Sequence, residues 1–493
     1  MMKPRNVVLF LAESWDGRKL GLTGHPALKE ATPNITRLAG AGAWFEQAYT
    51  SHPISCPARA NLWSGRYTHE LESWNNFKGL QPGMWALLDD LPKTHTLCSL
   101  GKLDYMAGGH TLFARVGAWL APVGLPKSSH RQLPQIQDPV VEPDRNPRCH
   151  EKDWQLIDQA QAFLRAQAGA EKPFFLNLST GLVHTPFRTN AYWLDKIPAD
   201  AVDLPPPDPT THPARLYQRL AKGWQHAGNE AAIRLVRRIY YAMCAEADAM
   251  IGALYDTLRE LDLLDSTYFV FAADHGEQAG EHGEWAKQSM YEASVRIPLI
   301  LAGPGIAPGA RIPDLVSLVD LCPTFLEMTG QPPRPGLAGQ SLLPSAAGHA
   351  RPGRDAVYAS FTGMTLNTSA YMLRRDHWKY VVYMGFPAQL FDLEQDPDEL
   401  HDLRAEHPEV AAALDAELRA LADYEQTHRD LVRYNKEAFR EWRRQARRGL
   451  YWDDTYSLAE HPSSDYWDIM RNTFEGYDEA DEACVDAWLA DER

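Results

Sequence analysis

The segment Ser55–Tyr67 combines residue types that suit attack on an anionic ester. Ser55 offers a hydroxyl, Pro57 suits the first position of a helix because its missing N–H needs no partner there, and Gly65 suits the end of that helix. The free N–H groups and the dipole at a helix N-terminus attract an anion. Arg59 lies one turn further on, so its guanidinium can fold back toward the hydroxyl. The spacing therefore predicts a nucleophile beside an anion-binding group.

Acidic residues follow two apolar segments that are far apart in the sequence. Glu13 comes directly after Asn6–Ala12, and Asp274 and His275 come directly after Thr267–Ala273. If the two segments are neighbouring strands, these side chains meet at the carboxyl edge of the sheet and form a divalent-metal site. Oxygen ligands suit Ca²⁺, Mg²⁺ or Mn²⁺, and His275 slightly weakens the case for Ca²⁺. One carboxylate after a strand is more often a helix cap or a solvated turn, so the prediction depends on the pair.

Buried strands and long helices are needed to bring these residues together. Five mainly apolar runs are typical of buried strands: Asn6–Ala12, Ala43–Tyr49, Pro173–Leu178, Thr267–Ala273 and Ile297–Ala302. The longest helical pattern is Ala231–Leu261, with one face expected in the core: Tyr240, Met243, Ala247, Met250 and Leu254. Alternating strands and helices predict an α/β fold with a large, mostly parallel, doubly wound sheet flanked by helices. Ligands bind such sheets beyond the carboxyl ends of the strands.

Three parts of the chain differ in composition. We expect a catalytic domain over residues 1–345, which ends in a stretch rich in Gly, Pro and Ala near Gly330–Asp355. Short strand-like runs and the helical segment Pro408–Tyr424 predict a smaller C-terminal α+β subdomain with an antiparallel sheet over residues 346–430. Residues 431–493 are rich in Trp, Tyr and charge, and we expect this tail to pack on the main domain or on a partner subunit.

The composition of the 493-residue chain excludes several classes of protein. A net charge of −16 argues against nucleic acid or an anionic membrane as a partner, so an anionic substrate needs local positive charge. The six cysteines are scattered without a CxxC pair, which favours free thiols in a reducing compartment. No apolar stretch approaches the roughly 18 residues of a membrane span, and the N-terminal residues lack a signal-peptide pattern. We therefore expect a cytoplasmic protein that binds neither nucleic acid nor membrane.

The segment that begins at Ser55 resembles the sulfatase signature, in which Cys or Ser is followed by x-Pro-x-Arg and later by Gly-Arg. Further motifs of that family occur in the expected order: Glu13 after a strand, Gly101-Lys102, His184 before Thr-Pro, Asp274-His275-Gly276-Glu277, Lys287 with Tyr291-Glu292, and Gln389–Leu393 before Asp396–Glu399. The chain is therefore identified as a member of the sulfatase family, in the alkaline phosphatase superfamily. It is most similar to the arylsulfatase K group, through Glu72–Gly79, Gly101–Tyr105 and Tyr241–Glu246.

The resemblance implies a role for the residues around the nucleophile. Ser55 is oxidised to formylglycine (3-oxoalanine), whose hydrated aldehyde attacks sulfur and whose second hydroxyl allows sulfate to be expelled. Cys56 is a buried neighbour, because only Ser55 places Pro57 and Arg59 at x-Pro-x-Arg. Arg59 holds the hydrated aldehyde, and one divalent metal, with Ca²⁺ favoured, neutralises charge on the transferred group. The implied metal ligands are Glu13, Ser55, Asp274 and His275.

The resemblance also implies contacts with the substrate. Lys102 and Lys287 clamp the sulfate oxygens, although either lysine taken alone is more often exposed to solvent. His184 protonates the leaving oxygen as a general acid, although such a histidine alone is more often a turn or core residue. His212 resembles a substrate-contacting histidine of the arylsulfatase K group. The implied substrate is a sulfated sugar such as a 2-sulfated uronate, or an aryl sulfate.

Three positions depart from the usual pattern of the family. Glu13 replaces Asp, so the longer side chain can shift the metal or bind it through both oxygens. Ser14 replaces an acid or amide, which leaves a weaker ligand or a water. Asp104 replaces a His that helps to regenerate the aldehyde, as in the arylsulfatase K group. The Ser form of the signature occurs in bacteria and is matured by a radical iron–sulfur enzyme, so we expect a formylglycine-maturation enzyme as a partner.

Two other functions stay open on the sequence. A phosphonate monoester or phosphodiester hydrolase of the same superfamily shares the metal site and the nucleophile. A non-catalytic sulfoglycan-binding protein would keep the pocket without oxidising Ser55. A homo-oligomer is also compatible with the sequence.

Overall fold

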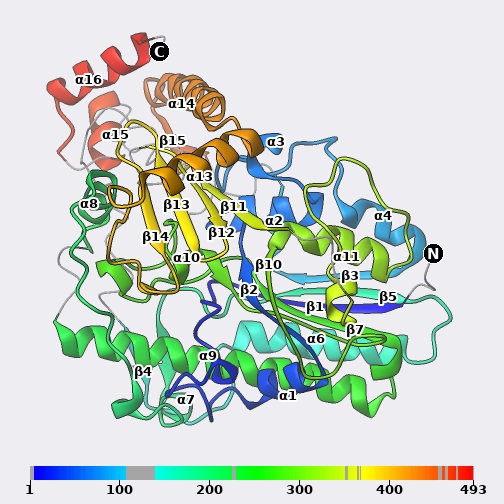
Figure 1. Ribbon diagram of the computed structural model, residues 1–493. Coiled ribbons are helices and arrows are strands. Elements are labelled where there is room, and N and C mark those ends of the chain that lie inside the picture. The colour runs from blue at the N-terminus through cyan, green and yellow to red at the C-terminus, as the bar shows by residue number, and fades with distance from the viewer. Residues whose placement is uncertain are drawn as a thin grey trace.

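A large central sheet organises the computed structural model, which describes residues 5–491 except 107–138, 225–228, 350–353, 364–365, 367, 453–457, 461–464 and 474–475 (Figure 1). Its strands are β1 (Asn6–Ala12), β2 (Gly42–Tyr49), β3 (Thr96–Gly101), β5 (Phe174–Ser179), β7 (Thr267–Ala273), β8 (Arg296–Ile297), β9 (Leu299–Ala302) and β10 (Ala310–Ser317). They lie in the order β10-β2-β9-β7-β1-β5-β3, and β8 pairs with β2. The sites expected at the ends of β1 and β7 therefore lie near the middle of the sheet.

Most of the strand pairs are parallel, as predicted. β1 is parallel to both β5 and β7, β3 is parallel to β5, and β10 is parallel to β2. The segment predicted as one strand over Ile297–Ala302 is instead divided at Pro298, which has no N–H for a ladder hydrogen bond. Its larger part, β9, is antiparallel to β7, because the chain returns through residues 274–298 from the edge at which β7 ends.

Helices cover both faces of this sheet (Figure 1). One layer contains α1 (Pro33–Ala41), α6 (Glu151–Gln167) and α9 (Glu230–Glu260), and the other contains α2 (Ser55–Ser64), α4 (Leu87–Thr94) and α11 (Leu321–Met328). Asn229 caps α9 by accepting the N–H of Ala232. The five residues predicted to face the core from α9 are all buried, which confirms the helical spacing read from the sequence.

Short elements connect these layers. The short helices are α3 (Thr68–Leu71), α7 (Ala191–Leu194), α8 (Pro213–Ala221), α10 (Glu292–Val295) and α12 (Leu343–Ala346), and β4 (Val140–Glu142) pairs with β6 (Arg188–Asn190). Single 3-10 turns lie at Gly21–Thr23, Ala199–Ala201, Leu264–Ser266, Glu281–Gly283 and Leu318–Asp320. Among the described residues, no helix is long and apolar enough to cross a membrane.

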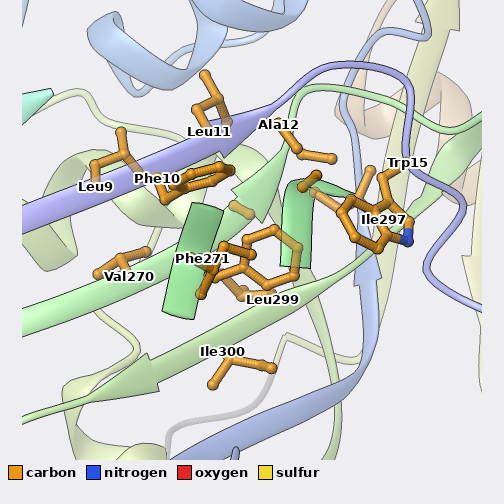
Figure 2. Packing of buried hydrophobic residues seen from close by; sticks show 14 of the residues in the cluster. Leu9, Phe10, Leu11, Ala12, Trp15, Val270, Phe271, Ile297, Leu299 and Ile300 are labelled. Atoms are coloured by element: carbon orange, nitrogen blue, oxygen red, sulfur yellow. The ribbon is translucent and has the colours of Figure 1, made fainter. Parts of the chain in front are cut away.

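Aromatic rings fill the core beneath the strand ends (Figure 2). The ring of Phe271 on β7 lies 6.1 Å from that of Phe10 on β1 and 5.4 Å from that of Trp15, in both cases edge to face. The indole N–H of the fully buried Trp15 donates to the Lys19 carbonyl oxygen at 2.9 Å. This packing fixes the loop that follows β1, and with it the position of Glu13.

A second, antiparallel sheet follows in the chain and packs beside the first (Figure 1). Its strands are β11 (Ala356–Phe361), β12 (Ala370–Arg375), β13 (Trp378–Tyr383) and β14 (Gln389–Asp392), in that order, with α13 (Pro408–Leu421) against them. The predicted small antiparallel sheet and helix are confirmed. The boundary expected after residue 345 falls within α12, and residues 350–353 of the boundary region lie outside the described residues.

The C-terminal part consists of α14 (Tyr424–Ala446), β15 (Leu450–Trp452), β16 (Leu458–Glu460), α15 (Tyr466–Thr473) and α16 (Glu479–Ala490). The boundary expected between residues 430 and 431 falls inside α14, because Tyr424–Ala446 contains no glycine or proline that would end a helix. Side chains of α14, α15 and α16 form a cluster that also contacts Phe77. This part therefore packs on the main domain, one of the two arrangements expected for it.

Candidate active site

The two acidic strand ends lie side by side in the sheet. β1 and β7 are parallel neighbours, with Ala12 opposite Ala273, so Glu13 and Asp274 leave the same edge. Donor atoms of Glu13, Asp274 and His275 lie within 4.8 Å of one another, and all three side chains are buried. The predicted meeting of these side chains is confirmed. Two carboxylates and one imidazole at this spacing fit a single divalent cation.

Ser55 begins helix α2 and faces this donor set. Its Oγ donates to Oε1 of Glu13 at 2.9 Å and lies 3.3 Å from Nε2 of His275. Pro57 is the third residue of the helix rather than the first, because the extended Ile54 already accepts the N–H of Ala58. A proline is tolerated there because the N–H groups of the first turn have no partner inside the helix.

Cys56 packs beside the site as a neutral thiol. Its Sγ lies 4.0 Å from the Met106 carbonyl oxygen, and its backbone N–H donates to Oδ1 of Asn76 at 3.0 Å. Burial, followed by the Asp104 carboxylate, raises the pKa of the thiol well above its usual value. Since the thiolate is the nucleophilic form of cysteine, the environment of Cys56 agrees with a packing role.

Arg59 joins two sides of the cluster. Its Nε and Nη2 each lie 3.0 Å from Oδ2 of Asp274, and its Nη1 donates to the Lys102 carbonyl oxygen at 2.6 Å. Nη1 also donates to Oγ of Ser179, at the end of β5, at 2.5 Å. Burial raises the pKa of Asp274, but His275 and Arg59 outweigh it and hold that pKa below its usual value. In the described part of the chain Arg59 thus orients Asp274 and shows no contact with Ser55.

Lys102 follows β3 at the same edge of the sheet. A Cβ at Gly101 would lie 1.9 Å from the Ser179 carbonyl oxygen, and Gly101 has φ +83°, so this turn requires glycine. Nζ of Lys102 lies 2.5 Å from Oε1 of Glu13 and 3.2 Å from Oγ of Ser55. Burial lowers the pKa of Lys102, but Glu13 outweighs it and raises the pKa above its usual value. The ammonium therefore stays charged beside the hydroxyl.

His184 and Lys287 form a second pair next to Glu13. Nζ of Lys287 donates a short hydrogen bond to Nε2 of His184, and Nδ1 of His184 donates to the Thr185 carbonyl oxygen at 2.5 Å. Nε2 of His184 also lies 3.7 Å from Oε1 of Glu13. Burial and the Lys287 ammonium lower the pKa of His184 to about 3. The imidazole is therefore neutral, and the hydrogen between the two side chains belongs to the lysine.

Three cations border the two metal-donor carboxylates of this cluster. Lys102, Lys287 and Arg59 surround Glu13 and Asp274, and Asp104 is a third carboxylate beside Lys102. Burial raises the pKa of Glu13, but the Lys102 ammonium, together with Lys287 and Arg59, outweighs it and holds the pKa well below its usual value. In a chain with a net charge of −16, these three groups supply the local positive charge that an anionic ester requires.

The positions that depart from the family pattern also face the cluster. The N–H of Ser14 lies 3.3 Å from Oδ1 of Asp274, and its buried Oγ has no hydrogen-bond partner among the described residues. A carboxylate oxygen of Asp104 lies 3.6 Å from Nζ of Lys102. Both residues therefore remain in contact with the groups that hold the metal and the anion in the family.

His212 is the one predicted site residue that the described structure does not join to the cluster. It precedes α8, donates from Nε2 to the Pro387 carbonyl oxygen at 2.8 Å, and packs at a tilt against Tyr383 with ring centroids 4.4 Å apart. Tyr383 and Pro387 both belong to the region of the second sheet. These contacts could not be predicted, because His212 lies far in the chain from Tyr383 and Pro387.

Two residues of the site were not singled out from the sequence. Oγ of Ser179, the last residue of β5, accepts a hydrogen bond from Arg59. Its position at the end of a buried strand was the only signal in the sequence that could have pointed to it. Asn76 receives the N–H of Cys56 at the start of α2. It lies within the segment Glu72–Gly79, which was noted for its resemblance but not for a contact.

A pocket of about 910 Å³ adjoins the cluster. Its lining includes Glu13, Lys102 and His184, and it continues over residues 142–153 and 181–188. This volume is within the range of small-molecule sites. The charged cluster is therefore joined to a space large enough for a substrate that extends beyond its anionic group.

Comparisons with known proteins agree with this geometry. The family model described as Sulfatase matches residues 5–331, and the model described as N-sulphoglucosamine sulphohydrolase, C-terminal, matches residues 280–424. The chain is 39% identical to arylsulfatase K of Rattus norvegicus over 470 residues, which is 89% of this chain and 81% of the relative. It is 38% identical to arylsulfatase K of Homo sapiens over 472 residues, which is 90% of this chain and 86% of the relative.

Solved structures share the fold at lower identity. A phosphonate monoester hydrolase of Agrobacterium radiobacter is 21% identical with a TM-score of 0.69, covering 93% of this chain and 100% of its own. A structure described as a 2-O GAG sulfatase is 22% identical with a TM-score of 0.66, covering 89% of this chain and 94% of its own. Since sulfatase and phosphonate hydrolase structures fit equally well, these two likenesses describe the fold and do not separate the reactions.

Proposed function

The chain belongs to the sulfatase family and is a sulfuric ester hydrolase, and we propose that it acts on a sulfated sugar such as a 2-sulfated uronate, through a formylglycine made from Ser55. The observation that carries the proposal is the position of the Ser55 oxygen, which lies against Glu13, His275 and the Lys102 ammonium. The Ser55 oxygen, which is the proposed nucleophile, is thus next to side chains that can bind a metal ion and next to an ammonium that can bind the anionic substrate.

One divalent metal ion fits the donors at this position. Glu13, Asp274, His275 and Ser55 would hold it. The buried Ser14 hydroxyl, which has no hydrogen-bond partner in the described part of the chain, belongs to a residue whose N–H contacts Asp274. Oxygen donors predominate, which favours Ca²⁺, with Mg²⁺ or Mn²⁺ as alternatives. When present, the formylglycine supplies a hydrated aldehyde as the nucleophile, and the metal neutralises charge on the group being transferred.

Other side chains of the cluster bind the sulfate, position Asp274 and transfer a proton. Lys102 and Lys287 bind the sulfate oxygens, because both ammonium groups border Glu13 and Lys102 also lines the pocket. Arg59 keeps Asp274 in place through two nitrogens. His184 passes a proton from Nε2 to the leaving oxygen, and Lys287, which already donates to Nε2, supplies that proton.

The sugar substrate is supported by the relatives and by the pocket. The relatives named arylsulfatase K are 38–39% identical over most of their length, and within the family that group resembles this chain through several segments. The pocket of about 910 Å³ leaves room for a sugar ring beyond Lys102 and His184. His212 stays a predicted substrate contact, because its described contacts are with Pro387 and Tyr383 and do not join it to the cluster.

The reaction can be separated from that of the nearest alternative by one assay. Matured protein is given 4-nitrophenyl sulfate, a 4-nitrophenyl phosphonate monoester, a bis-nitrophenyl phosphodiester and a 2-sulfated glucuronate glycoside. We expect the two sulfate esters to have the highest kcat/KM, with the sulfated glucuronate first. A preference for the phosphonate or the diester would contradict the proposal and favour the phosphonate monoester hydrolase reaction. Binding of the glycoside without turnover after maturation would favour a sulfoglycan-binding protein.

Several expectations about the protein's surroundings stay predictions. A formylglycine-maturation enzyme is required as a partner because Ser55 is encoded as serine. A homo-oligomer is left open by the aromatic tail, which could pack on a second subunit. A cytoplasmic location is expected from the scattered cysteines and the lack of a signal-peptide pattern, and the absence of nucleic-acid and membrane partners is expected from the net charge. They rest on the sequence alone.

A further inference from the structure

A buried carboxylate holds one histidine of the pocket in a fixed orientation. Glu246, on α9, is fully buried. It accepts the backbone N–H of His150 at 2.8 Å, the Nδ1–H of His150 at 2.7 Å and the indole N–H of Trp154 at 2.9 Å. Since a carboxylate accepts, Nδ1 carries the hydrogen and Nε2 is the ring atom left to bind something else. The His150 side chain is 21% exposed and lines the pocket that also contains Lys102 and His184.

The segment that carries His150 is anchored on both sides. Asn190, at the end of β6, donates to Oδ1 of Asp144 at 3.0 Å, and the indole N–H of Trp193 donates to the Pro147 carbonyl oxygen at 2.9 Å. In the first turn of α6, Asp153 accepts the N–H groups of Gly181 and Leu182 at 3.0 and 2.8 Å. Because these residues directly precede His184, the first turn of α6 is tied to the loop that carries the proposed general acid.

The two arginines of the pocket lining are already paired. Arg148 binds both carboxylate oxygens of Asp158, at 2.9 and 2.6 Å, and Arg188 pairs with Glu142. Cys149 lies within metal-binding distance of His150 and Glu246, but three N–H donors occupy Glu246, which favours a hydrogen-bonded histidine over a metal ligand. Within the described lining, His150 thus combines an unused ring nitrogen with a buried partner that fixes its direction.

We propose that His150, oriented by Glu246, hydrogen-bonds the sugar ring that carries the sulfate and so selects sugar sulfates over aryl sulfates. The inference rests on the proposed function and deepens it, because it names a residue of this chain that recognises the leaving group. A sugar offers hydroxyls that can donate to Nε2, whereas a simple aryl ring offers none. His150 is a specificity residue in this account, and Glu246 is a positioning residue that acts through it.

The test is the selectivity of variants. His150→Ala should lower the ratio of kcat/KM for 2-sulfated glucuronate to kcat/KM for 4-nitrophenyl sulfate by about 5–10-fold, mainly through KM, as expected for one lost hydrogen bond. Glu246→Gln should lower the ratio in the same direction by less, because Gln keeps the volume but changes the partner of Nδ1. The matched control is Gln155→Ala, an exposed residue of α6 outside the pocket lining, which should leave the ratio unchanged.

A 2-sulfated glucose glycoside identifies the group that His150 contacts. An equal loss of selectivity for glucose and glucuronate supports a hydroxyl that donates to Nε2, and a loss confined to glucuronate would overturn the assignment of Nε2 as the acceptor of a sugar hydroxyl. Equal losses on sugar and aryl sulfates would overturn the proposal and indicate a structural role. If His150→Ala does not fold, His150→Gln is measured in the same way.

A titration separates this inference from the proposed function. Absence of all sulfate-ester turnover by the matured wild-type protein would contradict the proposed function. In the serine form, calorimetry with 2-sulfated glucuronate should still show about 5–10-fold weaker binding by His150→Ala than by wild type. Equal dissociation constants would overturn the role of His150, whatever the turnover.

Discussion

Two buried clusters of carboxylates and lysines in this molecule have opposite properties. One is the candidate active site around Glu13 and Asp274. The other lies between the two sheets, where Nζ of Lys379 on β13 binds Glu292 at 2.9 Å and Glu399 at 2.7 Å. The Lys379 side chain is 0% exposed, whereas that of Lys102 is 29% exposed. The residue types are the same, so the difference in function must come from access.

Access to a pocket differs between the two clusters, although both hold three cations. Lys102, Lys287 and Arg59 lie against Glu13 and Asp274, and Lys102 lines the pocket. Between the sheets, Glu292 and Glu399 share Lys379, Glu292 also lies 3.7 Å from both Arg296 and Arg374, and burial raises the pKa of Glu399 although Lys379 opposes it. A closed cluster with paired charges joins elements, and an open cluster whose cation borders a pocket can bind an anion. This contrast is the physical basis for assigning catalysis to one cluster and structure to the other.

Removing a carboxylate from the site gives the largest expected effect. Asp274→Ala should abolish metal binding and turnover together, because it removes a metal donor and the partner of Arg59. Metal content and kcat/KM on 4-nitrophenyl sulfate measure this, with exposed Asp265→Ala as the control. Wild-type turnover in Asp274→Ala would refute the metal site.

Removing the lysine between the sheets should affect stability alone. Lys379→Met removes the buried ammonium that two buried glutamates share, and the free energy of unfolding should fall by about 3–5 kcal/mol. Urea unfolding measures the loss, and kcat per folded molecule should stay at the wild-type value. Exposed Lys93→Met, which breaks a surface pair with Asp90, is the control and should cost less than about 1 kcal/mol. A loss of turnover without a loss of stability would break the comparison.

Removing a lysine from the open cluster, the candidate active site, should affect turnover more than stability. Lys102→Ala should lower kcat by about 10²–10³-fold, because a charge-stabilising donor next to the nucleophile is lost. The free energy of unfolding should change less than in Lys379→Met, since Lys102 is partly exposed. Assayed side by side, Lys102→Ala should therefore lose mainly kcat, and Lys379→Met should lose mainly free energy of unfolding. A similar profile for both would contradict the division into open and closed clusters.

Acidification should change the stability contributed by the two clusters in opposite directions, and this is the smallest of the expected effects. The pKa of Glu13 is depressed in the folded state, so its contribution to stability is present above the unfolded pKa of about 4.3 and is lost as the pH falls through the folded value. The pKa of Glu399 is raised, so its contribution grows as the pH falls through the folded value. In metal-free protein, Glu13→Gln should make stability fall less steeply with acid, and Glu399→Gln more steeply. Urea unfolding between about pH 6 and 3 measures both slopes, and slopes that change in the same direction would contradict the assignment.

Much of the fold could be predicted because apolar runs and helical spacing are local signals. Thr267–Ala273 and Ala356–Phe361 are strands with the bounds expected from the sequence, and the core face of α9 is buried as predicted. The direction of β9 could not be predicted, since it depends on the edge from which the chain returns. The boundary expected between residues 430 and 431 falls inside α14, because a rise in aromatic and charged content does not mark where a helix ends.

The site was predicted where residues follow strands or begin a helix, since such positions converge at one edge of a parallel sheet. Glu13, Asp274 and Ser55 meet for this reason. The partners of Arg59 and the orientation of His150 could not be predicted, because Ser179 and Glu246 are ordinary residues of a strand and a helix until the tertiary fold brings them close. His212 illustrates the converse: a role implied by resemblance is not accompanied by a contact with the cluster in the described residues.

The chemical state of Ser55 tests the central claim most directly. The chain is expressed together with a formylglycine-maturation enzyme that acts on Ser-type signatures, and the peptide containing Ser55 is weighed by mass spectrometry alongside an assay on 4-nitrophenyl sulfate. The account predicts a peptide lighter by two hydrogen atoms, in a fraction that rises with kcat across preparations. A fully active preparation in which Ser55 is unmodified would contradict it.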